Sequence, residues 1–71
     1  MNSKEELKYL KNLSKTIKKL RLEKSFTQAD LNVDERTIRR IENENFNPSF
    51  LTLIQISKAL DVPIGRLFDM E

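Results

Sequence analysis

The fold of this chain is set by three short stretches: Phe26-Thr27-Gln28-Ala29-Asp30-Leu31, Thr37-Ile38-Arg39-Arg40-Ile41-Glu42 and Asn47-Pro48-Ser49. Threonine is a good residue for capping a helix, and an aspartate three positions later is favourable in the first turn. The two isoleucines of the second stretch repeat at helical spacing. The proline of the third marks a loop, and the serine after it can cap a further helix. The pattern predicts two short helices around a turn, then a loop and another helix.

Helical periodicity continues on both sides of these stretches. Ser3-x-x-Glu6 reads as a capping box that predicts a first helix from about residue 4 to about residue 24. A second helix starts after Thr27 and ends at the Asn32–Asp34 break, and later helices are expected over about 35–44, 50–60 and 64–68. No run alternates like a strand. We therefore expect an all-α fold of five short helices.

The composition bounds the chemistry. The chain has 71 residues, enough for one domain, with no cysteine, no histidine and one glycine. Disulfides, thiolate metal sites, histidine catalysis and a glycine-rich phosphate cradle are thereby excluded, and no Asp/Glu cluster has metal-ligand spacing. We expect no enzymatic activity, no metal and no cofactor. No apolar run approaches the length of a membrane span and nothing resembles a signal peptide, so the expected location is cytoplasmic.

Charge is distributed unevenly along the chain. The net charge is +2, but residues 1–40 carry eleven Lys/Arg against six Asp/Glu, and residues 41–71 carry two against five. A molecule with a basic half can present one face to a polyanion. The alternative is a set of solvated helix faces, because lysine-rich helices are common.

The order Thr-Gln-x-x-Leu, x-Ile-x-x-Ile-Glu and Asn-Pro-Ser resembles the helix-turn-helix of Xre and lambda-repressor-like (Cro-type) transcriptional regulators. The resemblance covers roughly Leu13 to Phe68 and leaves residues 1–12 as an N-terminal helical extension of a single domain over 1–71. It implies that the helix over 35–44 reads double-stranded DNA in the major groove.

Residues of the expected reading helix divide into two faces. If Ile38 and Ile41 face the core, the outer face and its margins carry the following residues: Glu35, Arg36, Thr37, Arg39 and Arg40. Arginine suits both guanine edges and phosphate oxygens. The resemblance implies that all of these except Arg39 face the bases. The alternative is a solvated face whose arginines pair with neighbouring glutamates.

Five further positions have an expected role, and for Gln28 and the pair of Arg21 and Glu42 the resemblance implies it. Gln28 would contact the DNA backbone, and the alternative is an ordinary residue at a helix start. Asn43 and Asn45 would either donate to phosphate or end the helix. Arg21 and Glu42 would form an ion pair that ties the first helix to the reading helix, as opposed to two unrelated surface charges.

The chain departs from the resembling family in its second helix. Relatives have about ten residues from the Thr to the apolar residue of the turn, whereas Thr27 and Val33 are six apart. The shortened second helix is expected to remove two apolar side chains from the core. The extended first helix, with Leu7, Tyr9 and Leu10, is the candidate for compensation. A structural alternative is one continuous helix over 27–44 with no turn, because neither Gly nor Pro interrupts it.

These observations lead to one functional hypothesis and one alternative. The hypothesis is a sequence-specific DNA-binding transcriptional regulator, most simply a repressor, that acts as a homodimer on a two-fold site. The resemblance implies dimerisation through the C-terminal helix, where we expect an interface of Val62, Ile64, Leu67 and Phe68. Leu7, Tyr9 and Leu10 are the alternative interface, and both sets have the option of folding back onto the core. The alternative function is an antitoxin or other interaction module whose partner is a toxin or another protein.

Overall fold

Three α-helices and two short 3-10 helices make up the part of the chain that the structure describes, residues 3–44 and 46–69 of a computed structural model. Asn45 and the outermost residues of the expected domain lie outside the described residues. The elements follow in the order α1 (Lys4–Glu23), η1 (Gln28–Leu31), α2 (Glu35–Glu44), α3 (Phe50–Leu60) and η2 (Ile64–Phe68).

The all-α prediction is confirmed over the described ranges, which contain no strand. Only three of the five expected helices are α-helices. The second and fifth helices are 3-10 helices of four and five residues. Asn32 follows η1 in the left-handed conformation, with φ of 60°, and ends it after one turn. The alternative of one continuous helix over 27–44 is therefore wrong.

Local side-chain hydrogen bonds explain where the helices begin. Ser3 and Glu6 form the predicted capping box, with the Ser3 amide donating to the Glu6 carboxylate at 2.7 Å. The side chain of Asp34 accepts a hydrogen bond from the amide of Thr37 at 3.3 Å, at the start of α2. At the start of α3, Ser49 accepts from the amide of Thr52. Each side chain satisfies an amide that the helix leaves without a partner.

Three turns require a left-handed backbone on residues other than glycine. Ser25, Asn32 and Asp61 have φ of 59°, 60° and 58°. Asn and Asp tolerate this conformation better than other residues, because their short side chains can hydrogen-bond locally. Ser25 adopts the positive φ for which glycine is better suited.

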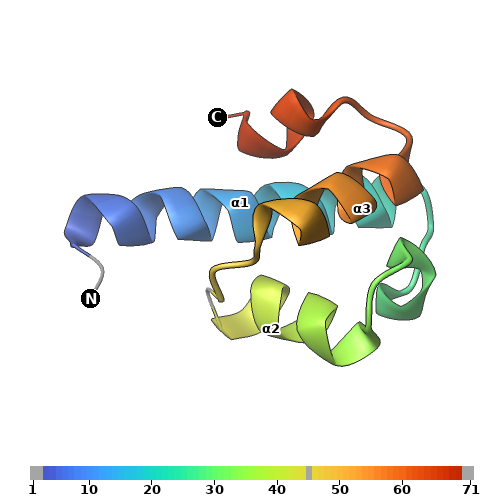
Figure 1. Cartoon of the computed structure of the whole chain (residues 1–71), viewed down its shortest axis with the longest axis horizontal. Helices are drawn as coiled ribbons and strands as arrows, with labels where there is room; N and C mark the ends of the chain where they lie inside the picture. Colours follow the sequence, from blue (N-terminus) through green and yellow to red (C-terminus); the bar gives the residue numbers. More distant parts are fainter. Residues whose placement is uncertain (1–2, 45, 70–71) are drawn as a thin grey trace.

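Helix α1 runs through the middle of the molecule, with α2 on one side and η2 on the other, and α3 overlaps it in this view (Figure 1). Every element contributes to one core. Its fully buried side chains are Ile17, Leu31, Ile38, Ile41, Ile56, Leu60 and Leu67.

The core around the shortened second helix is packed by residues of other elements, and not by Leu7 and Tyr9 at the start of α1. Leu31 of η1 is fully buried, and Phe26, Val33 and Phe46 pack around the core as partly buried side chains. Of the three residues expected to compensate for the missing ones, Leu7 and Tyr9 are 37% and 55% exposed and do not do so, whereas Leu10 is partly buried. The radius of gyration is 11.2 Å, and about 11 Å is expected for a compact chain of this length.

Candidate nucleic-acid interface

Helix α2 lies at the edge of the molecule and presents one whole side to solvent. It is the outermost element on its side of α1 (Figure 1). Ile38 and Ile41 are completely buried, which fixes the rotation of the helix about its own axis. Successive residues are 100° apart around a helix. Arg36 and Asn43 therefore point directly away from the core.

Arg39 and Arg40 flank that outward direction on either side, and both are exposed. Arg40 is held by two neighbours. Its guanidinium lies 4.3 Å from the centre of the Phe46 ring, and its Nε lies 3.7 Å from a carboxylate oxygen of Glu44. Among the described residues, no hydrogen bond or ion pair engages Arg36 or Arg39. The alternative pairing of these arginines with Glu35 and Glu42 is absent from the structure.

The remaining residues predicted for this face differ in accessibility. Glu35 and Asn43 are exposed, whereas Thr37 is only partly exposed at the first turn of α2, where its amide is bound to Asp34. The structure therefore brings together on α2 all six residues that the sequence assigned to this helix. It presents Arg36, Arg39, Arg40 and Asn43 most openly.

A buried ion pair sets the position of α2 against α1. The guanidinium of Arg21 donates through Nε and Nη2 to the two carboxylate oxygens of Glu42, at 2.8 and 3.0 Å. Its Nη1 donates to the carbonyl of Phe26 at 2.7 Å. The Arg21 side chain is 9% exposed and that of Glu42 is 0% exposed. The hydrogen bond to Glu42 raises the pKa of Arg21, so the guanidinium is charged at any ordinary pH.

Gln28 belongs to this buried cluster. Its Nε2 donates to the same Glu42 oxygen that accepts from Nη2 of Arg21, at 3.2 Å. The side chain of Gln28 is thus directed at Glu42, and its partial exposure leaves a limited surface for any contact with DNA. The Glu42 carboxylate joins the end of α1, the start of η1 and the last turn of α2.

Two side chains of this region were not among the predicted residues. The hydroxyl of Ser14 lies 2.5 Å from the Ile41 carbonyl and 3.0 Å from that of Leu10, and its single proton serves one at a time. Ser14 lies two turns before Arg21, on the same face of α1, which is the signal that would have identified it. Phe46, whose ring lies against the Arg40 guanidinium, is in the loop after α2 and carried no periodic signal.

The four residues assigned to a dimer interface do not share one environment. Leu67 is completely buried in the core of the single chain, so its assignment to an interface needs correction. Val62 and Ile64 are partly buried against the same core. Phe68 is 48% exposed and lines an open hollow between α1, α3 and η2. The other residues of the hollow are Glu6, Tyr9, Leu10, Leu13, Asn47 and Leu53.

Two findings concern other classes of site. In the described parts of the chain, no group of three or more His, Cys, Asp or Glu side chains is placed to hold a metal ion. Over the same residues, none of the helices combines the length and the apolar character that crossing a membrane requires.

Comparison with known proteins agrees with this geometry. The family model for helix-turn-helix proteins matches residues 17–67, more than half of the chain. No curated protein and no solved structure matches it at a significant level. The matched region starts inside α1 and includes the buried ion pair and all of α2. The chain therefore belongs to the Xre and lambda-repressor-like helix-turn-helix family, a family of DNA-binding transcription regulators.

Proposed function

We propose that this protein is a transcriptional repressor that binds double-stranded DNA sequence-specifically by inserting α2 into the major groove. One observation carries the proposal. The edge helix α2 has its two isoleucines fully buried and carries arginines and Asn43 on the opposite, exposed side. A helix of this width fits the major groove, where arginine pairs with the O6 and N7 atoms of guanine. The shortened second helix leaves α2 projecting, which supports DNA binding over the fused arrangement.

The position of each side chain supports a division of roles. Arg36 points directly outward and is free to reach base edges, and Arg40 is oriented by Phe46 beside it. Arg39 and Asn43 are the candidates for phosphate contacts. Glu35 would accept from cytosine N4 or repel phosphate, and Thr37 is a minor contributor because it is partly covered.

The experiment is selection of bound sequences from a random duplex pool, followed by gel-shift measurements on the selected site and on an unrelated duplex. Arg36→Ala is expected to lower affinity for the selected site by about 1–3 kcal/mol and to relax preference at one or two base pairs. Lys58→Ala, an exposed change on α3, is the matched control and should alter neither. Wild-type protein without any base preference would refute sequence-specific reading. If Arg36→Ala lowered the affinity for both duplexes equally, Arg36 would contact phosphate and not a base.

We also propose that the protein binds a two-fold site as a homodimer, with its two reading helices about 34 Å apart. Phe68 is the most exposed of the four C-terminal apolar residues, and its neighbours across the hollow are Tyr9 and Leu10. Phe68→Glu is expected to shift sedimentation toward monomer at micromolar concentration while leaving the fold intact. Leu67→Glu does not serve this purpose, because it places a charge in the core of the single chain. A wild-type monomer that binds both half-sites without cooperativity would refute the dimer.

A second candidate function has its own support. Phe50 and Leu51, at the start of α3, are 66% and 63% exposed, and two adjacent large apolar side chains form a surface suited to a protein partner. An antitoxin or other interaction module would use such a surface. Phe50→Ser with Leu51→Ser should leave DNA affinity unchanged if DNA is the main partner. Wild-type protein that binds no duplex even at low salt would favour this second function.

A further inference from the structure

A row of lysines runs along one side of α1, outside the reading helix. The lysines lie four and three residues apart in alternation, and this spacing returns to the same side of a helix on every turn. We call the following five residues the lysine row: Lys4, Lys8, Lys11, Lys15 and Lys18. All five are exposed, and at about 1.5 Å per residue the row is about 21 Å long.

The side of α1 that carries the lysine row has positive charges and no acidic residue. The acidic residues of α1 lie on its other sides, by the same count of 100° per residue. Among the described residues, no ion pair or hydrogen bond engages any of the five side chains. Lysines three or four residues apart repel each other and destabilise an isolated helix. The free protein is therefore destabilised by repulsion among these lysines, and a bound polyanion would remove that repulsion.

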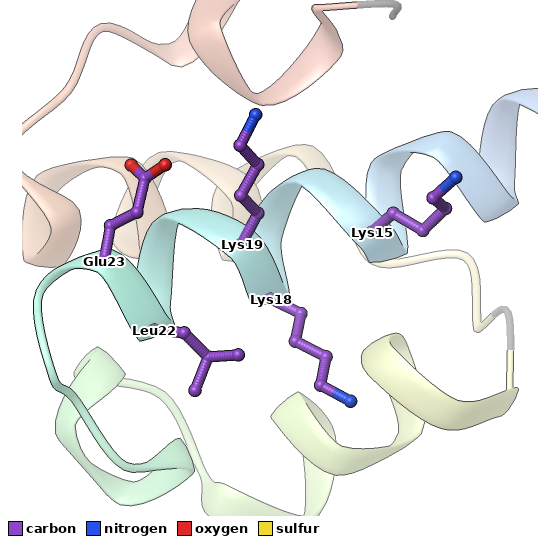
Figure 2. A pocket seen from close by; sticks show the side chains of 5 residues that line it. All are labelled: Lys15, Lys18, Lys19, Leu22 and Glu23. Atoms are coloured by element: carbon purple, nitrogen blue, oxygen red, sulfur yellow. The ribbon is translucent and has the colours of Figure 1, made fainter.

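The row also continues toward the reading helix. Figure 2 shows Lys18 pointing toward α2, whereas Lys19, one residue further, points to the opposite side, where η2 lies. Lys15 points away from α2 in the same view, and the open hollow on α1 is lined by Lys15, Lys18, Lys19, Leu22 and Glu23. Lys18 is one turn of helix away from Arg21, which holds α2 through Glu42. The C-terminal end of the row is thus beside α2, and the rest extends away along α1.

We propose that the lysine row is a second DNA contact, which binds the phosphate backbone beside the major groove that α2 enters. This inference rests on the proposed function. One strand of duplex DNA carries a phosphate about every 3.4 Å along the axis, so about 21 Å of duplex axis spans about six phosphates of one strand. Lysine binds phosphate as a point charge without base selectivity, and the row therefore adds affinity but no sequence preference. Four of its five residues precede the region matched by the family model, so most of the contact lies outside that region.

The experiment compares two double variants with the same change in net charge. Lys11→Gln with Lys15→Gln removes two charges from the row, and Lys24→Gln with Lys58→Gln removes two exposed charges elsewhere. Binding to the selected duplex and to an unrelated duplex is measured from about 50 to about 200 mM salt. The row variant is expected to lose about tenfold or more in affinity on both duplexes and to lower the log–log salt slope by about 1–2. The control is expected to lose less than about threefold and to keep the wild-type slope.

Each outcome bears on a different conclusion. Equal slopes for the row variant, the control and the wild type would overturn the lysine row and leave the reading by α2 intact. Wild-type protein that binds no duplex would overturn the proposed function and, with it, this inference. A row variant that loses affinity for the selected duplex alone would show base contacts, which also contradicts the proposal. The thermal midpoint of the free row variant at low salt should equal or exceed that of the wild type, which separates lost contacts from lost folding.

Discussion

Removing the carboxylate of Glu42 should destabilise the protein more than any surface change, because three hydrogen bonds converge on it. Glu42→Ala removes the acceptors of Arg21 Nε, Arg21 Nη2 and Gln28 Nε2, at 2.8, 3.0 and 3.2 Å. It leaves the Arg21 guanidinium, 9% exposed, with the Phe26 carbonyl as its one remaining partner in the structure. Breaking a buried ion pair from one side costs about 3–5 kcal/mol.

That cost is large on the scale of this domain. At about 0.05–0.15 kcal/mol per residue, a chain of this length has a free energy of unfolding of about 4–11 kcal/mol. Glu42→Ala should therefore remove about a quarter or more of the free energy of unfolding. The assay is urea unfolding followed by far-UV circular dichroism. The effect should change little between low and high salt, because buried pairs are weakly screened.

A double-mutant cycle tests the physical cause. Arg21→Met alone should cost about as much as Glu42→Ala, because it leaves a buried carboxylate. Arg21→Met with Glu42→Leu should lie within about 1–2 kcal/mol of the wild type, since neither charge is then stranded. Single variants that each cost under about 1 kcal/mol, or a double variant that costs the sum of the singles, would refute the reasoning.

The pH dependence of this contribution also has a definite sign for Arg21. Its folded-state pKa is raised, so the stability it contributes is fully present below the pKa of the unfolded state and is lost only as pH rises through the folded value. An unperturbed arginine titrates above about pH 12. Between about pH 6 and pH 9, Arg21 should therefore contribute no slope to the free energy of unfolding.

Three further changes follow from the geometry. Leu67→Ala should lower the free energy of unfolding by about 2–5 kcal/mol at every protein concentration, because it opens a cavity within one chain. A loss that disappeared on dilution would indicate that Leu67 lies in an interface between chains. Ser25→Gly should raise the free energy of unfolding by about 0.5–1 kcal/mol in urea unfolding, since φ is 59° there, and a loss would show that the serine side chain contributes more than the strain. Phe46→Leu should weaken binding to the selected duplex by about 0.5–1 kcal/mol by releasing Arg40, and unchanged affinity would remove the ring from the proposed site.

Much of the candidate site was predictable because it depends on short-range rules. The spacing of Ile38 and Ile41 orients α2, and Arg36 and Asn43 then face outward whatever packs behind them. The helix over residues 35–44 was predicted with the bounds that the structure has. Asp34 caps this helix as the sequence indicated. The partners of these outward residues in the same chain were less predictable, because Phe46 approaches Arg40 across a loop.

The family resemblance supplied the one long-range contact that was predicted. Arg21 and Glu42 are 21 residues apart, and no periodic pattern connects them. Their pairing was implied by matching positions in related repressor folds, and the structure contains it. The same resemblance placed Gln28 on the DNA backbone, whereas its amide donates to Glu42. The buried pair is therefore confirmed, whereas the contact of Gln28 with DNA stays a prediction.

Capping and periodicity act over a few residues, and they therefore predicted where the helices begin, which faces they bury and that the fold is all-α. The way in which the shortened second helix is accommodated depends on packing between distant elements. This helix forms a single 3-10 turn that buries Leu31, while Leu7 and Tyr9 remain exposed. Tertiary packing also places Leu67 in the core and leaves Phe68 partly exposed. Adjacent apolar residues are equivalent until packing against other elements distinguishes them, and that packing involves contacts between distant parts of the chain.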